Sequence, residues 1–254
     1  FLVNRVNSEK LLSKKIHFLF APIIIVILSF IGYFYFNFIF LLIFFIYNLY
    51  HVTKQSLGIS KLFIKNEKEI EIQTFFIYVF NFLFLLIGLS RFYLGFNNGN
   101  ITVVTTLIVS ICILLSILYY TIKFGANENV LTLITGIVIF LPVCFVSQPI
   151  HGIIMGVTMH YVQYLALTYK ITLGRRNEGS LVDQKSNYTF VIIIFLYGLI
   201  MAVLSSANQF QITIFEFLIV IPIIGQLLHF YLDGFLWKFS DKHHRNVTLK
   251  YIKS

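Results

Sequence analysis

Three histidines lie within long apolar stretches of this chain, where ionisable side chains are rare. They are His51 in YHVTKQ, His160 in MHYVQY and His229 in LLHFYLDG. An imidazole can bind a metal ion, move a proton or ligate haem. Inside a bilayer an ionisable side chain is costly, and it usually faces the interior of a helix bundle or a cavity. These three residues are therefore the first candidates for chemistry.

Each histidine has polar neighbours three or four residues away, on the same face of a helix. The neighbours are Gln55 for His51, Gln163 and Tyr164 for His160, and Gln226 and Asp233 for His229. A metal-bound imidazole normally donates its other N–H to a carboxylate, a carbonyl or water. We therefore predict that the three glutamines orient the metal ligands. Asp233 and Tyr164 are the predicted catalytic residues: Asp233 orients His229 or binds the metal, and Tyr164 donates a hydrogen bond.

A fourth histidine, His151, precedes His160 in the stretch HGIIMGVTMH. On a straight helix the two lie about 14 Å apart along the axis. Successive residues are rotated by roughly 100°, so this pair points to opposite faces. His151 is a fourth metal ligand only if the helix is broken between them. On an unbroken helix it is a structural residue at the outer rim, near Pro149.

The composition decides which solvent surrounds these residues. The chain has 254 residues, of which 58% are hydrophobic and 11% are charged, whereas a soluble domain carries roughly 25% charged residues. We therefore predict a polytopic membrane protein: an all-α bundle of transmembrane helices, with residues 1–254 forming a single integral membrane domain. The expected location is the bacterial inner (plasma) membrane.

A spanning helix needs about 20 mainly apolar residues, and the chain offers about eight such stretches. We place them at 16–33, 36–57, 72–92, 101–123, 129–148, 150–170, 188–207 and 211–237. Spans one and two are joined tightly through GYFYFN, and Pro149 in SQPIHG separates spans five and six. No small-residue cleavage site interrupts the first stretch, so we predict a first span and not a signal peptide. Since the sequence begins at Phe1 and not at Met, we expect residues ahead of it.

The basic residues set the predicted orientation. Of the 19 lysines and arginines, all except Arg91 fall on one side of the predicted spans, and Arg91 is expected to face the outer headgroups. Short basic loops stay cytoplasmic, so both termini are predicted to be cytoplasmic. The same bias accounts for the net charge of +9. We therefore expect membrane lipids and no nucleic acid as partners.

The three histidines also lie at matched depths in the predicted bundle. Spans two, six and eight run from the outside to the cytoplasm, and each histidine is followed by a lysine after about three turns. The pairs are His51 and Lys61, His160 and Lys170, and His229 and Lys238. The distance within each pair is roughly 14–15 Å along the helix. We predict that the three rings share one layer and converge on one metal ion. Lys54, about one turn below that layer, either pairs with Asp233 or snorkels to the headgroups.

This architecture of many spans and few histidines resembles the Brp/Blh family of bacterial and archaeal membrane β-carotene dioxygenases. The resemblance covers most of the chain in architecture and four positions in detail: His51, His151, His160 and His229. It implies iron held by a small set of histidines. That family places two of its ligands one helical turn apart, whereas HGIIMGVTMH separates its two histidines by more than two turns.

The leading hypothesis is a membrane-embedded, histidine-ligated metal oxygenase or oxidase. Its substrate would be a lipid-soluble small molecule such as a carotenoid or a lipid. Imidazole suits iron, copper and zinc alike, so iron follows from the resemblance, with zinc, copper or haem as alternatives. Three other functions stay open: a proton-coupled transporter or channel, a b-type haem protein and a structural subunit. The P-loop, GxSxG, HExxH and the clustered histidine boxes of membrane desaturases are absent from the sequence.

Overall fold

The chain folds into helices. The computed structural model describes residues 16–96, 99–177, 192, 195, 196, 198–200, 203, 220–236 and 249, and within these residues it contains helices and no strand. The predicted all-α class is therefore confirmed for this part of the chain. Helices suit an apolar surrounding because each one satisfies its own backbone hydrogen bonds.

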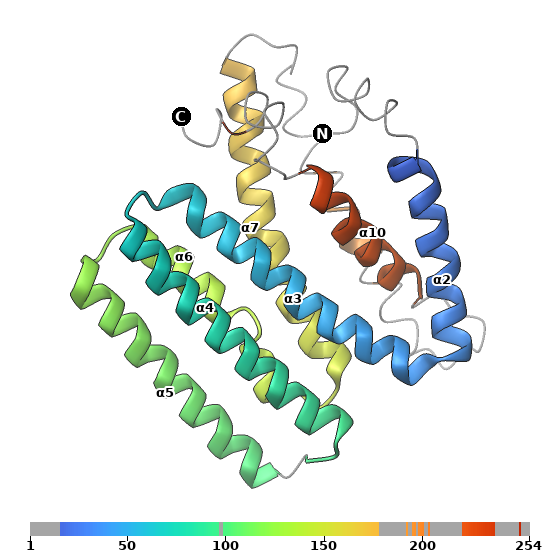
Figure 1. The fold of residues 1–254 in the computed structure, drawn as a ribbon, viewed down its shortest axis with the longest axis horizontal. Coiled ribbons are helices and arrows are strands. Elements are labelled where there is room, and N and C mark those ends of the chain that lie inside the picture. Colours follow the sequence, from blue (N-terminus) through green and yellow to red (C-terminus); the bar gives the residue numbers. More distant parts are fainter. Residues whose placement is uncertain are drawn as a thin grey trace. The chain divides into compact units, whose positions relative to one another are not determined.

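From η1 to α7 the helical elements follow closely on one another (Figure 1). In chain order they are η1 (Ile16–Phe20), α2 (Ala21–Tyr35), α3 (Asn37–Phe63), α4 (Glu67–Gly88), η2 (Leu89–Tyr93), α5 (Gly99–Phe124), α6 (Asn129–Val138), η3 (Leu141–Cys144), α7 (Pro149–Asn177) and α10 (Val220–Leu236). The η1 and η2 elements are π-helical and η3 is a 3-10 helix. Only Phe36 separates α2 from α3, which confirms the tight connection. Pro149 is the first residue of α7, where its fixed φ suits the first helical turn.

Four helical segments are long and apolar enough to cross a membrane. They are Ile16–Tyr35, Asn37–Phe63, Glu67–Tyr93 and Gly99–Phe124, and they match the first four predicted spans. Two shorter apolar segments are Asn129–Cys144 and Val220–Phe235. These helices support a membrane protein. The count of eight spans and the cytoplasmic side of both termini stay predictions, and most of predicted span 188–207 lies outside the described residues.

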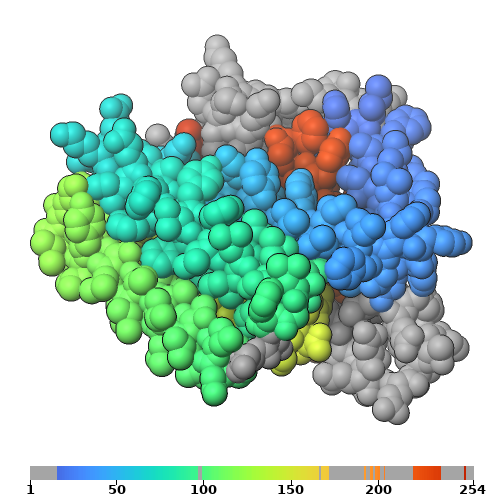
Figure 2. Space-filling model, turned by 60° about the horizontal axis from the view of Figure 1, so that its bottom comes forward, coloured from blue at the N-terminus to red at the C-terminus, as the bar shows by residue number. Residues whose placement is uncertain are grey.

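Helix α5 has the surface expected of a helix in lipid. Its buried residues Val109, Ile113 and Tyr120 form one stripe at helical spacing. Large apolar side chains cover the remainder, and Leu114 and Ile122 are 65% and 76% exposed. In Figure 2 the green atoms of this helix lie beside those of α4 on the face turned to the viewer. Lipid tails can cover such a surface without the cost that water would impose.

The described part of the chain belongs to two compact units. Unit 1 comprises residues 1–41 and 175–250, and unit 2 comprises residues 42–174 and 251–254. In unit 1, α2 and the preceding η1 turn pack near α10. The ring of His17 lies 4.9 Å from that of Phe235, and its Nδ1 lies 3.2 Å from the hydroxyl of Tyr231. The single domain predicted for residues 1–254 stays a prediction.

Unit 2 is built around α4, which packs against α5, α6 and η3. Two of its glycines allow close approaches to α4. A Cβ atom at Gly88 would collide with the ring of Phe45 on α3 and touch Val143 on η3. A Cβ atom at Gly136 of α6 would overlap Ile77 of α4. Small residues let neighbouring backbones come close, which is how helices associate where lipid removes the hydrophobic driving force.

The predicted span 129–148 is not one continuous helix. It is divided into α6 and η3, and Pro142 lies within η3. A proline removes one backbone donor and frees a carbonyl from the helical pattern. Arg91 supplies donors in this region: its Nη1 donates to the carbonyl oxygen of Val143 at 2.5 Å, and its Nη2 donates to that of Val146 at 2.9 Å. Arg91 is only 7% exposed, so the expectation that it faces the outer headgroups is wrong.

Candidate metal centre

Two of the three predicted ligands meet within unit 2. His51 lies on α3 and His160 lies on α7, and their ring centroids are 6.0 Å apart with the planes at 89°. His160 is fully buried, and His51 is 9% exposed. Two helices that are far apart in the sequence therefore bring two imidazoles together in the interior of the unit.

The separation of these two rings suits ligands of one metal ion. An imidazole nitrogen lies about 2.0–2.1 Å from a bound zinc ion, and other first-row metals are similar. Two imidazoles on one ion therefore have ring centroids roughly 5–6.5 Å apart. The nitrogen lone pairs lie in the ring planes, so perpendicular rings can still direct one nitrogen each toward a shared ion. The pair can supply two neutral nitrogen ligands.

The predicted neighbours of His160 lie on the same part of α7. The ring of Tyr164 is 5.9 Å from the imidazole of His160, centroid to centroid, at 61°. Gln163 is half-buried, and its side-chain oxygen has no hydrogen-bond partner among the residues that the structure describes. Gln55, one turn after His51, is also half-buried. The shared faces are as predicted, while the hydrogen bond assigned to Tyr164 stays a prediction.

Within unit 1, His229 and Asp233 lie on one face of α10, as their spacing predicts. His229 Nε2 lies 3.4 Å from Asp233 Oδ2, and the side chains are 23% and 5% exposed. A carboxylate beside an imidazole fixes the ring and its N–H, as it does in many metal sites. Asp233 is therefore placed to orient His229, and Gln226 is half-buried one turn earlier. Lys238, which marks the predicted depth of His229, lies outside the described residues.

His151 does not meet the condition set for a fourth ligand. Helix α7 is continuous from Pro149 to Asn177, so it is unbroken between His151 and His160. His151 is exposed, and its backbone N–H donates to the carbonyl of Gln148 at 3.2 Å at the start of the helix. His151 therefore lies at the exposed start of α7, away from the buried face that carries His160, and its position at the outer rim stays a prediction.

Lys54 lies among tyrosines of unit 2, and both of its predicted roles stay predictions. Its side chain is exposed, and Nζ donates to the hydroxyl of Tyr78 at 2.8 Å. The ammonium also lies 5.6 Å from the centre of the Tyr50 ring.

Sequence reasoning missed a buried polar cluster in unit 2, the Glu69 cluster. Its members are Glu69, Gln73, Tyr120, Asn129 and Thr132. Glu69 Oε1 accepts hydrogen bonds from the hydroxyl of Tyr120 at 2.5 Å and the side-chain amide of Asn129 at 2.9 Å. Gln73 Nε2 donates to the Tyr120 oxygen and to the Asn129 carbonyl, each at 2.7 Å. Thr132 donates to Gln73 Oε1 at 3.1 Å. The one-turn spacing of Glu69 and Gln73 is the local signal that could have indicated it.

The chemistry of the candidate metal centre depends on His51, His160, His229 and Asp233. The resemblance to membrane β-carotene dioxygenases stays a prediction from the sequence. Comparisons of the chain with protein-family models, with curated proteins and with solved structures find no match.

Proposed function

We propose that this chain is a membrane-embedded metalloenzyme in which histidines hold iron and a lipid-soluble substrate is oxidised. The observation that carries the proposal is the meeting of His51 and His160 in unit 2, with ring centroids 6.0 Å apart. Both imidazoles are buried. Two bases placed together in a dry interior favour a cation that both can bind.

The third ligand in this proposal is His229, assigned from its matched depth in the sequence. Asp233 would hold the ring of His229 or complete the set of ligands. A centre of imidazoles and one carboxylate with an open position is the kind of site that non-haem iron oxygenases use. Iron bound there would supply the activation of O₂. The protein's own residues would fix the ligands, exclude water and admit the substrate from the lipid.

The substrate class follows from the surroundings. The described helices α3 and α7 bury apolar side chains close to the histidines in the sequence, including Leu49, Val52 and Val157. Apolar surroundings of this kind suit a hydrocarbon better than a polar metabolite. A carotenoid or another lipid in the plasma membrane is therefore the proposed substrate.

The decisive test is the metal content of the full chain purified in detergent. We expect about one iron per chain in the wild type and its loss in His160→Ala. His151→Ala is the matched control, because it removes an exposed histidine from the same helix, and it should keep the metal. Wild-type protein without stoichiometric metal, or His160→Ala with unchanged metal, would contradict the proposal. A Soret band in the wild-type spectrum would instead indicate haem.

The number of imidazoles on the ion tests the role of His229. X-ray absorption at the iron edge should indicate three imidazole ligands in the wild type. The His229→Ala variant should show two, whereas Asp233→Asn should keep all three if the carboxylate only orients the ring. An unchanged spectrum in His229→Ala would show that His229 is not a ligand of the metal.

The contact between His229 and Asp233 also favours a second candidate, a proton-coupled transporter. An imidazole 3.4 Å from a carboxylate is a pair that can exchange a proton. In liposomes loaded with a pH-sensitive dye, a transporter would acidify the lumen when the outside is acid, and His229→Gln would stop that flux. Metal-free protein that carries protons in this assay would replace the enzyme proposal.

A further inference from the structure

One lysine of unit 2 lies on the exposed side of a helix that is long and apolar enough to cross a membrane. Lys54 is exposed on α3, and it follows Tyr50, the central residue of that helix, by four positions. It therefore lies only about 6 Å along the axis from the middle of the helix. An ammonium group at such a depth in a bilayer is costly unless it is paired.

Two tyrosines fix the position of this ammonium. Its Nζ donates to the hydroxyl of Tyr78 on α4 at 2.8 Å, and it lies 5.4 Å and 5.6 Å from the centres of the Tyr78 and Tyr50 rings. Because Tyr50 precedes Lys54 on α3, the ammonium lies toward the middle of the helix and not toward its nearer end at Phe63. Within the described residues, the Tyr78 hydroxyl proton and two N–H groups of Lys54 have no acceptor.

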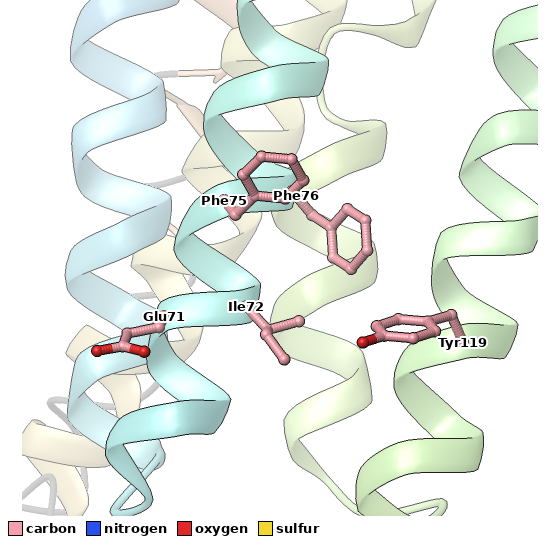
Figure 3. A pocket seen from close by; sticks show the side chains of 5 residues that line it. All are labelled: Glu71, Ile72, Phe75, Phe76 and Tyr119. Carbon is pink, nitrogen blue, oxygen red and sulfur yellow. The ribbon is translucent and has the colours of Figure 1, made fainter.

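No acid in the described part of unit 2 pairs with Lys54. Glu71 is the last acid of α4, and Figure 3 shows its side chain on the side of α4 turned away from Tyr119 of α5. It precedes Tyr78 by seven residues, or about 10 Å along the helix. In a helix centred on the bilayer, lipid phosphates lie beyond a hydrocarbon half-thickness of about 15 Å. An anion that pairs with Lys54 therefore has to lie within the hydrocarbon core.

The exposed surface around Lys54 is elongated, and its shape indicates the kind of partner. Exposed residues recur along α3 at helical spacing and form the Lys54 stripe: Ile43, Tyr47, Tyr50, Lys54 and Gly58. The stripe is about 22 Å long. A Cβ atom added at Gly58 would meet nothing within 4 Å, so a second helix can approach closely there. A stripe of this length matches a helix, whereas a small anion would contact only the ammonium.

We propose that the Lys54 stripe binds a transmembrane helix of a partner protein that carries an aspartate or glutamate near its middle. The carboxylate accepts from the ammonium of Lys54 and from the hydroxyl of Tyr78. The two charges are complementary, and each satisfies the other where no water is present. His51 lies on the buried side of α3, so this surface is separate from the candidate metal centre.

The test is fluorescence energy transfer between the labelled full chain and synthetic transmembrane peptides in vesicles of zwitterionic lipid. The peptides are leucine helices with one central Glu, Gln or Lys. We expect the wild type to bind the Glu peptide about tenfold more tightly than the Gln peptide, since polar contacts between model transmembrane helices contribute about that factor. Lys54→Gln should abolish this preference. Lys61→Gln, which changes an exposed lysine in the last turn of the same helix, should keep it.

A charge exchange distinguishes a specific pair from a general loss of structure. Lys54→Glu should bind the Lys peptide and reject the Glu peptide, which a misfolded variant would not do. Equal binding of the Glu and Gln peptides to the wild type would overturn the proposal. Stronger binding of the Glu peptide by Asp233→Asn than by the wild type would also overturn it, because Lys54 would then pair with Asp233 inside the chain. Loss of the preference in vesicles with anionic lipid would assign Lys54 to lipid phosphates instead.

Discussion

Two buried polar sites in unit 2 differ in how their members complement each other. In the Glu69 cluster donors meet acceptors, with hydrogen bonds of 2.5 Å from Tyr120 to Glu69 and 3.1 Å from Thr132 to Gln73. The contact between His51 and His160 brings together two groups of one type, each with a nitrogen lone pair. Complementary groups stabilise one another directly. Two neighbouring imidazoles can also share a cation, which is the role proposed above for the second site, whereas the first site is a hydrogen-bonded network.

The largest expected effect is on the amount of bound metal, which should depend on the histidine pair and not on the Glu69 cluster. His51→Ala should lower the bound metal by at least about tenfold, because it removes one ligand outright, and even neighbours of ligands cost 10–100-fold. Asn48→Ala is the control: Asn48 is a buried polar residue on the same helix, and its amide donates to the carbonyl of Phe44. Elemental analysis of the purified variants measures the difference. Equal metal content in the two variants would contradict the different roles that we expect for the histidine pair and the Glu69 cluster.

Glu69→Ala should give the largest loss of stability and no loss of metal. The substitution leaves the Tyr120 hydroxyl and the Asn129 amide without their buried acceptor, which costs about 2 kcal/mol. Glu67→Ala, at an exposed position in the first turn of the same helix, should change the free energy of unfolding by less than about 0.5 kcal/mol. Unfolding in detergent followed by circular dichroism compares the two. A Glu69→Ala protein that lost its metal as well would show that the two sites are coupled.

Tyr120→Phe should have a smaller effect of the same kind. It removes one hydroxyl from the cluster but keeps the buried ring, so we expect a cost of about 1 kcal/mol. Tyr35→Phe, at a 78% exposed side chain, is the control and should be neutral. If Tyr120→Phe is also neutral, the short contact with Glu69 contributes little and the cluster is held by the two amides.

Thr132→Ala should give the smallest effect, about 0.5 kcal/mol. Thr132 donates to Gln73 Oε1 and lies within hydrogen-bond distance of the carbonyl of Asn129. The substitution therefore removes one hydroxyl at the edge of the cluster and leaves the hydrogen bonds to Glu69 in place. The same unfolding experiment applies. A cost larger than that of Tyr120→Phe would reverse the ranking and place the centre of the cluster at Gln73.

Local patterns explain why much of the helical fold was predictable. Apolar stretches of about 20 residues define the first four spans, and the structure has a helix at each of them. Pro149 and the GYFYFN connection are short-range signals, and both mark helix boundaries as expected. The break at Pro142 was missed because its apolar neighbours concealed it within a long hydrophobic stretch. Arg91 donates from another helix to the carbonyls of Val143 and Val146, which follow that break, and no local pattern reveals this.

The candidate site, like the fold, has features that were predictable from the sequence and features that were not. That His229 and Asp233 share a face was predictable, because residues one turn apart on a helix are neighbours whatever the surroundings. The continuity of α7, which keeps His151 away from the face of His160, depends on backbone geometry that the glycines in HGIIMGVTMH leave open. The Glu69 cluster draws its members from three helices, so spacing within one helix indicates only the pairs Glu69 with Gln73 and Asn129 with Thr132, and not that the two pairs meet.

By itself the sequence determined that this chain is helical and apolar, and it determined which polar side chains share a helix face. Those properties depend on composition and on the helical repeat, both of which are local. Only the tertiary structure decided that His51 meets His160, that Arg91 is buried against the carbonyls of Val143 and Val146, and that Tyr120 bonds to Glu69. Each of these contacts depends on how helices far apart in the sequence pack, and packing is set by the shapes of many side chains at once.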